Sequence, residues 1–151
     1  EVVTENPFVV VDYAHTPDAL KNICQGIKKT FPNYKLKVLF GCGGDRDRLK
    51  RPIMASVVAD WADEIYVTSD NPRSEKADAI LVQMTLGLEI QEPSAVIEDR
   101  SAAIKAAVNE AKDGDLVIVL GKGHEKGQEI SGVLHPFDDR IELAKAIEDK
   151  K

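Results

Sequence analysis

The sequence contains four short polar segments whose side chains could bind a charged ligand. They lie at residues 12–15, 41–48, 69–75 and 121–125. Together they supply arginines, carboxylates, an asparagine and glycine-rich stretches. A guanidinium group pairs with a carboxylate or a phosphate, whereas a carboxylate accepts hydrogen bonds from an ammonium group. This mixture favours a zwitterionic ligand, because a nucleotide alone gives no clear role to Asp70 and Glu125.

The tetrapeptide Asp70-Asn71-Pro72-Arg73 combines a rigid turn with side chains that could bind both ends of a zwitterion. Pro72 restricts Asn71 to extended geometry and fixes the turn, so that the flanking side chains project from a rigid loop. Arg73 offers a fork for a carboxylate, and Asp70 and Asn71 can accept bonds from an ammonium group. Because Asn-Pro is also common in ordinary turns, the tetrapeptide by itself fits a plain turn equally well.

The segment 41–48 combines a bare glycine backbone with alternating charges. Glycines let a ligand approach the main chain, and Arg46 could bind a carboxylate or a phosphate through two hydrogen bonds. The alternative is a tight turn with solvated charges. The segment does not fit the dinucleotide fingerprint G-x-G-x-x-G, because Arg46 occupies the sixth position counted from Gly41.

The segment 121–125 is not a phosphate-binding Walker loop, because Gly123 rather than serine or threonine follows Lys122. Glu125 fits an acceptor for an amine, and His124 fits an orienting group or a general base. The histidines at 15, 124 and 135 lack the spacing of metal ligands, and His135 fits a structural or exposed side chain. We therefore expect no metal-binding residue here.

Strand and helix patterns alternate along the chain and would position these segments. Continuously apolar runs predict strands, and apolar residues at helical spacing predict helices. Strands are expected at 8–11, 36–40, 65–68, 95–97 and 115–120, with an added edge strand within 128–136. Helices are expected after Thr16, from about Pro52, over 77–84, after Asp99 or Ser101, and after Asp138-Asp139.

This alternation predicts an α/β fold with an open, doubly wound, mostly parallel sheet flanked by helices, which is a Rossmann-like architecture. The 151 residues suit one domain, residues 1–151. Ligands of such sheets bind outside the carboxyl ends of the strands. The four polar segments follow predicted strands, so we expect them to gather at one rim.

Composition excludes several classes of protein. The net charge of −6 argues against nucleic acid and anionic membranes as partners, since both require a basic face. No apolar run reaches the roughly 20 residues of a membrane span, and the start has no signal-like stretch. Cys24 and Cys42 are too few for a disulfide framework. We expect a cytoplasmic monomer with reduced, buried cysteines.

Five segments occur in an order that resembles MurE-type ligases, and the resemblance covers essentially the whole chain. The segments are Asp-Tyr-Ala-His-Thr-Pro at 12–17, Gly-Gly-Asp-Arg-Asp at 43–47, Thr-Ser-Asp-Asn-Pro-Arg at 68–73, Gly-Lys-Gly-His-Glu at 121–125 and Phe-Asp-Asp-Arg at 137–140. The resemblance implies a Mur ligase C-terminal, amino-acid-binding domain. The N-terminal UDP-sugar domain and the central ATPase domain of that family would be absent from this chain.

The resemblance further implies an ATP-dependent amide ligase of peptidoglycan synthesis. Such enzymes add meso-diaminopimelate to UDP-N-acetylmuramoyl-L-alanyl-D-glutamate. An acyl phosphate forms first, and the amino group of the incoming residue attacks it. ATP and Mg²⁺ would be held mainly by the absent central domain, on which this domain closes. We therefore expect the isolated domain to be inactive, and assign no catalytic residue to it.

The family also implies roles for particular residues. Those expected to bind meso-diaminopimelate are Arg46, Asp70, Asn71, Pro72, Arg73, Gly121 and Glu125. Asp12 and His15 are expected near the nucleotide. Lysine-adding relatives depart from this pattern at the arginine of the Asp-Asn-Pro-Arg motif, so Arg73 favours diaminopimelate over lysine. Lanthionine, which has the same two amino-acid ends, is not distinguished.

Two other functions remain open at this point. One is a related ligase that uses lysine, another amino acid or a folate-type substrate, as folylpolyglutamate ligases do. The other is a stand-alone nucleotide-binding or signalling α/β module. The lack of a phosphate-binding loop disfavours the nucleotide-binding module. Substrate competition would distinguish the related ligase from a diaminopimelate ligase.

Overall fold

The central sheet is built mainly from parallel strands because helices carry the chain back between them. The computed structural model describes residues 1–5, 8–88 and 93–151. In these residues the sheet has the strand order β1-β2-β6-β3-β4-β5, and only the β1–β2 pairing is antiparallel. The strands are β1 (Val2–Glu5), β2 (Phe8–Asp12), β3 (Lys35–Phe40), β4 (Glu64–Val67), β5 (Ala95–Val96) and β6 (Asp115–Leu120).

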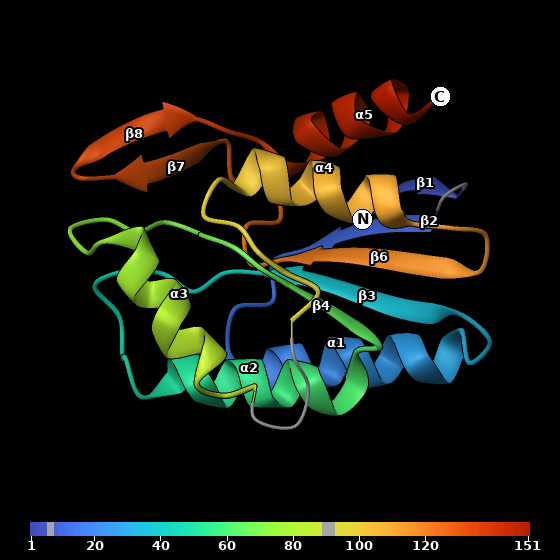
Figure 1. Cartoon of the computed structure of the whole chain (residues 1–151), viewed down its shortest axis with the longest axis horizontal. Coiled ribbons are helices and arrows are strands. Elements are labelled where there is room, and N and C mark those ends of the chain that lie inside the picture. The colour runs from blue at the N-terminus through green and yellow to red at the C-terminus, as the bar shows by residue number, and fades with distance from the viewer. Residues whose placement is uncertain (6–7, 89–92) are drawn as a thin grey trace.

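Helices cover both faces of this sheet (Figure 1). On one face lie α1 (Pro17–Thr30), α2 (Lys50–Trp61) and α3 (Ala77–Thr85), and on the other lie α4 (Arg100–Glu110) and α5 (Asp139–Lys150). Strand β6 is buried along its whole length, and its side chains alternate between the hydrophobic cores of the two faces. This burial explains why its sequence is continuously apolar. The predicted doubly wound, mostly parallel α/β fold is confirmed.

The starts of α1, α4 and α5 follow the expected capping chemistry. The side chain of Thr16 accepts a hydrogen bond from the backbone of Ala19 at 3.2 Å, with proline at the first helical position of α1. Asp99 rather than Ser101 caps α4, and Asp138 caps α5. Helix α2 lacks a side-chain cap and begins at Lys50, slightly before the predicted start.

Two features differ from the sequence prediction. Strand β1 was not predicted, and it pairs with β2 at the edge of the sheet. The predicted edge strand within 128–136 is wrong: β7 (Gly127–Ile130) and β8 (Val133–Pro136) form a separate antiparallel hairpin. Its turn places Ser131 and Gly132 at φ of 51° and 78°, as type I′ hairpins require. Figure 1 shows the hairpin beyond the carboxyl ends of the strands.

The chain leaves neighbouring strands in opposite directions at this edge. From β3 it continues to α2 on one face, whereas from β6 it continues through the hairpin to α5 on the other face (Figure 1). Such a divergence leaves a crevice outside the carboxyl ends of the strands. No helix in the described parts of the chain is both long and apolar enough to cross a membrane.

Candidate functional site

A cavity of about 320 Å³ lies in this crevice, where all four polar segments meet. Its volume suits a small molecule. It is lined by seven of the residues predicted from the sequence, namely His15, Arg46, Asp70, Asn71, Arg73, Gly121 and Glu125, together with others that include Tyr13, Cys42 and Arg51. Pro72 and Asp12 do not line it. The topology therefore brings together side chains from four distant loops.

The backbone of Arg73 is held by the β7–β8 hairpin. Arg73 has a φ of 54°, in the left-handed region that costs energy for a residue with a side chain. Its N–H donates to the carbonyl of Glu129 at 2.9 Å, and its own carbonyl accepts from Ser131 at 2.8 Å. The hairpin thus offsets the strain at Arg73, and gives β7 and β8 a role that the sequence did not reveal.

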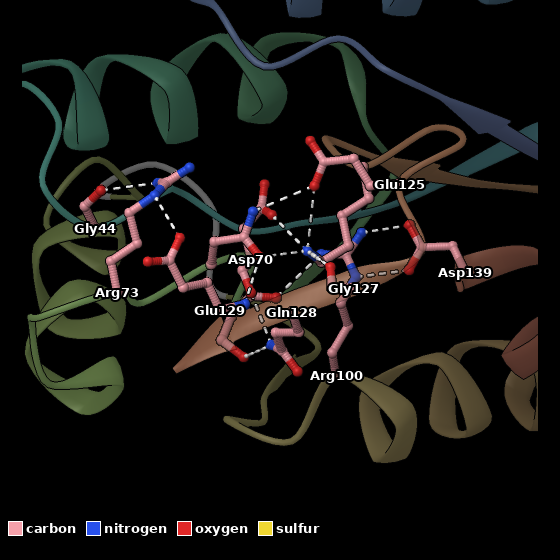
Figure 2. A network of polar contacts seen from close by, with 12 residues as sticks. Gly44, Asp70, Arg73, Arg100, Glu125, Gly127, Gln128, Glu129 and Asp139 are labelled. Atoms are coloured by element: carbon pink, nitrogen blue, oxygen red, sulfur yellow. Dashed lines mark hydrogen bonds and ion pairs between the residues drawn. The ribbon is translucent and has the colours of Figure 1, made fainter. Parts of the chain in front are cut away.

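The side chain of Arg73 crosses to the glycine-rich segment. Its Nη1 donates to the carbonyl of Gly44 at 2.9 Å, and its Nε lies 3.5 Å from a carboxylate oxygen of Glu129 (Figure 2). A Cβ atom on Gly44 would lie 1.8 Å from the carbonyl oxygen of Pro72. Gly44 therefore permits the close approach of the two loops that positions Arg73.

A buried ion pair braces the same two loops. The Nη2 atom of Arg51 lies 2.5 Å from Glu75 and donates to the carbonyl of Gly43 at 2.9 Å. Glu75 also accepts a hydrogen bond from the backbone of Asp45. The hydrogen bonds from Arg51 lower the pKa of Glu75 to about 2, although partial desolvation raises it. Sequence reasoning did not identify this pair, whose members are 24 residues apart.

The opposite wall of the cavity contains a cluster of charges around Lys122. The Lys122 side chain is fully buried, and its Nζ lies 3.2 Å from Asp70 and 3.6 Å from Glu125. It donates to the Oδ1 of Asn71 at 2.7 Å. The Nδ2 of Asn71 in turn donates to Glu125 at 3.2 Å. The side-chain oxygen of Asn71, which the sequence suggested as an acceptor for an ammonium group, is therefore occupied by protein donors.

Gly121 leaves the carboxylate of Asp70 open to the cavity. It has a φ of 113°, and a Cβ atom at this position would lie 2.7 Å from the Oδ2 of Asp70. The Oδ1 of Asp70 is buried and accepts no hydrogen bond from any described residue, with the Lys122 ammonium as its charged neighbour. Because the Oδ1 faces Lys122, the Oδ2 beside Gly121 is the atom suited to accept a hydrogen bond from a bound ammonium group.

Arg100 joins the ends of two strands beneath the site. Its fully buried guanidinium makes two 2.7 Å hydrogen bonds to Asp139. It also donates to the backbone carbonyls of Ser69 and Leu120, which directly precede the loops bearing Asp70 and Gly121. The resemblance included Asp139, but its partner 39 residues away was not predicted.

The remaining predicted residues are less constrained. Arg46 is exposed at the rim and donates to the carbonyl of Asp45 at 3.1 Å. His15 is exposed, with its Nδ1 2.8 Å from the carbonyl of Tyr13. Asp12 turns into its own loop and accepts from the backbone of Ala14 at 2.9 Å. The predicted roles of these residues in ligand binding stay predictions.

Comparison with known proteins assigns the chain to a family. Residues 1–123 match the family model described as "Mur ligase, glutamate ligase domain". The chain belongs to the Mur ligase C-terminal domain family. It is 49% identical over 135 residues to a UDP-N-acetylmuramoyl-L-alanyl-D-glutamate–2,6-diaminopimelate ligase of Cytophaga hutchinsonii, covering 88% of this chain and 28% of the relative. The Streptomyces coelicolor ligase of the same name is 50% identical over 149 residues, covering 93% and 28%.

Solved structures agree with this assignment. A UDP-N-acetylmuramoyl-L-alanyl-D-glutamate–2,6-diaminopimelate ligase superposes with a TM-score of 0.87 at 45% identity, covering 95% of this Mur ligase C-terminal domain and 29% of that chain. A Mycobacterium tuberculosis folylpolyglutamate synthase has a TM-score of 0.63 at 18% identity, over 80% and 28% of the respective chains, and shares the fold. The domain thus spans less than a third of these relatives.

Cys42 lies in the cavity wall of the Mur ligase C-terminal domain, but its chemistry does not suit a nucleophile. Burial raises the pKa of its thiol to about 12, and the negative charge of Asp70 acts in the same direction. The reactive thiolate is therefore scarce at neutral pH.

Proposed function

We propose that this domain binds meso-diaminopimelate for a ligase that joins it to UDP-N-acetylmuramoyl-L-alanyl-D-glutamate in peptidoglycan synthesis. The observation that carries the proposal is one cavity with the Arg73 guanidinium on one side and the carboxylates of Asp70 and Glu125 on the other. Each amino-acid end of diaminopimelate carries a carboxylate and an ammonium group. The names of the relatives, which are diaminopimelate ligases, support the same substrate.

The charges on the two walls determine which part of the ligand each wall would bind. Arg73 is already aligned by its bond to Gly44 and would receive the distal carboxylate, with Arg46 reaching in from the rim to the other one. The carboxylates of Asp70 and Glu125 would accept hydrogen bonds from the distal ammonium group. Pro72 and Gly121 act on ligand binding through the loop shape and the open space that they provide.

In the proposed reaction this domain presents the other amino group of the ligand to an activated carboxylate. ATP would supply that activation by transferring its terminal phosphoryl group to the dipeptide carboxylate, which gives an acyl phosphate and ADP. The amine would then attack the acyl carbon, lose a proton and displace inorganic phosphate to give the amide. The described residues contain no group of three or more histidine, cysteine or carboxylate side chains placed to hold a metal ion. We propose that ATP and Mg²⁺ are held mainly by other domains of the ligase, on which this domain closes near Asp12 and His15.

Ligand titrations followed by NMR would test this proposal, because they detect weak binding to the 151-residue chain. We expect meso-diaminopimelate to bind more tightly than L-lysine, since lysine has no distal carboxylate for Arg73. Replacing Arg73 with alanine removes a charge-assisted contact worth about 1.5–3 kcal/mol and should abolish that preference. Lanthionine should behave like diaminopimelate.

Arg48→Ala is the matched control, because Arg48 belongs to the same pair of loops but is 67% exposed and lies outside the cavity. It should retain the preference for diaminopimelate. Equal affinity of the wild-type chain for lysine would contradict the proposal, and so would an unchanged preference in Arg73→Ala. Binding of ATP alone, without either amino acid, would instead favour a nucleotide-binding module.

A further inference from the structure

Lys122 is a buried cation beside the cavity that cannot contact a ligand directly. Its side chain is fully buried, and it is not among the residues that line the cavity. An ammonium group has three donors. Two of them are used by the Oδ1 of Asn71 at 2.7 Å and the carbonyl of Gly127 at 3.0 Å. The third faces the carboxylates of Asp70 and Glu125. Its effect on a ligand must therefore pass through its neighbours.

One of these effects concerns orientation. The Oδ1 of Asn71 accepts from Lys122 and from the backbone N–H of Glu129 at 3.0 Å. These two bonds fix the amide plane, so that the Nδ2 points to Glu125 and donates to it at 3.2 Å. Lys122 thereby fixes, through Asn71, the direction in which the Glu125 carboxylate faces the cavity. Figure 2 shows Glu125 and Asp70 joined to this network.

The other effect concerns charge. Asp70 and Glu125 bring two negative charges to this wall, and Lys122 brings one positive charge close to both. The group therefore has one excess negative charge, which matches a single ammonium group. Without Lys122, the wall would have two excess negative charges. It would then attract ligands whose distal end is purely cationic more strongly than ligands whose distal end is zwitterionic.

We propose that Lys122 is a positioning residue for ligand selection, which makes the cavity prefer a distal amino-acid end over a bare amine. This inference rests on the proposed binding of diaminopimelate. It assigns part of the specificity to a residue that touches no ligand atom, in addition to the direct contact made by Arg73. Lys122 disfavours lysine-like ligands by offsetting the charge that would attract them.

The test compares the affinities of meso-diaminopimelate and L-lysine in variants of the 151-residue chain. Lys122→Met removes the charge at similar length, and we expect the ratio of the two affinities to fall about tenfold, because lysine loses less than diaminopimelate. Lys122→Arg, which retains the charge, should recover most of the ratio. Lys122→Gln is neutral but can still donate to Asn71. It provides a second test of the charge if the Met variant does not fold.

Lys37→Met is the matched control, because Lys37 is an equally buried lysine between two carboxylates, at the opposite edge of the sheet. Its removal should lower stability and leave the affinity ratio unchanged. An equal loss of both ligands in folded Lys122→Met and Lys122→Gln would overturn the inference and leave the proposed function standing. A wild-type chain without preference for diaminopimelate would instead overturn the proposed function.

Discussion

Lys37 and Lys122 are buried lysines with similar partners at opposite ends of the parallel strands. Lys37 lies where the strands begin (the amino edge), and Lys122 lies where they end (the carboxyl edge). Each ammonium group is buried, donates to a backbone carbonyl and lies near two carboxylates. At the amino edge, Lys37 pairs with Glu64 at 2.9 Å and with Asp115 at 3.5 Å, and the hydroxyl of Tyr66 closes the group by donating to Glu110. Burial and then Glu110 raise the pKa of Tyr66, which keeps this hydroxyl a donor.

The carboxyl edge differs in what is left unsatisfied. There the Oδ1 of Asp70 accepts no hydrogen bond from the described residues, and Glu125 is 35% exposed beside the cavity. A closed group of charges stabilises the fold, whereas an open one retains capacity for a ligand. The two groups therefore differ in that the carboxylate partners of Lys122 also face open space, which is where we propose the ligand site.

The largest expected effect is on stability at the amino edge. Lys37→Met leaves the buried Asp115 without its cation, whereas Glu64 keeps Lys35, and removing one partner of a buried pair costs about 3–5 kcal/mol. Urea unfolding would measure this loss. Lys105→Met is the control: Lys105 is 59% exposed and lies 3.9 Å from Asp149, so its loss should change stability by less than about 1 kcal/mol. Equal losses of stability in the two variants would contradict the prediction that the buried lysine contributes more than the exposed one.

Lys122→Met should cost less than Lys37→Met, because water in the cavity can solvate the freed carboxylates of Asp70 and Glu125. We expect a loss of about 1–3 kcal/mol in the same urea experiment. Adding meso-diaminopimelate should stabilise the wild-type chain more than this variant, since ligand binding to the folded state raises stability. A loss of stability as large as that of Lys37→Met would contradict this, because it would show that water does not reach the carboxylates of Asp70 and Glu125.

The close contact between the loops predicts an effect of comparable size from a single methyl group. Gly44→Ala places a Cβ against the carbonyl of Pro72, so the loops must separate at a cost of about 1–3 kcal/mol. The contact of Arg73 with this loop should be lost, and ligand affinity with it. Gly26→Ala is the control: Gly26 lies within α1 with no atom within 4 Å of the added Cβ, so this change should stabilise by about 0.4–1 kcal/mol.

The free energy of unfolding should depend on pH through one carboxylate at each edge, Glu64 and Glu75, and variants of the two should separate their effects. Glu64 has a pKa of about 2: burial opposes this shift, but hydrogen bonds from Lys35 and Lys37 outweigh it. Glu75 also has a pKa of about 2. Because both values lie below the usual 4.5, their contributions are complete above about pH 4.5 and disappear as the pH falls through 2. The free energy of unfolding should decrease over this window.

Glu64→Gln and Glu75→Gln should each flatten that decrease and lower stability above pH 4.5. Only Glu75→Gln should also weaken ligand binding at neutral pH, because Glu75 braces the loops that hold Arg73. Chemical denaturation across pH, combined with ligand titration, would measure both quantities. Weakened binding in Glu64→Gln would show that the two edges are coupled.

The sequence predicted the features that depend on local patterns. The apolar run of β6, the caps Thr16 and Asp99, and the polar segments after the strands were sufficient for the fold and for the rim where the cavity lies. The pairings were not predictable, because a sequence shows which charges exist but not which of them meet. The sequence around Lys122 does not fit a Walker loop and suggests no other role for this lysine, because its partner Asn71 lies 51 residues away.

The hairpin and β1 were missed for related reasons. Strand β8 is exposed along its length, so it lacks the alternation of apolar and polar residues that marks a half-buried strand. The role of the hairpin lies in the hydrogen bonds that Glu129 and Ser131 make to the backbone of Arg73, which cannot be read from the sequence. Among the described residues the antiparallel edge strand β1 pairs only with β2, and none of its residues is fully buried.

The buried pair of Arg100 and Asp139 determines when the binding site can first exist during synthesis. Arg100 holds the carbonyls of Ser69 and Leu120, but its counter-charge comes from Asp139, which the ribosome adds after every strand of the sheet and the hairpin. Until Asp139 has left the exit tunnel, Arg100 would be buried without its anion. The proposed binding site therefore cannot take its final form before the first turn of α5 has emerged from the ribosome.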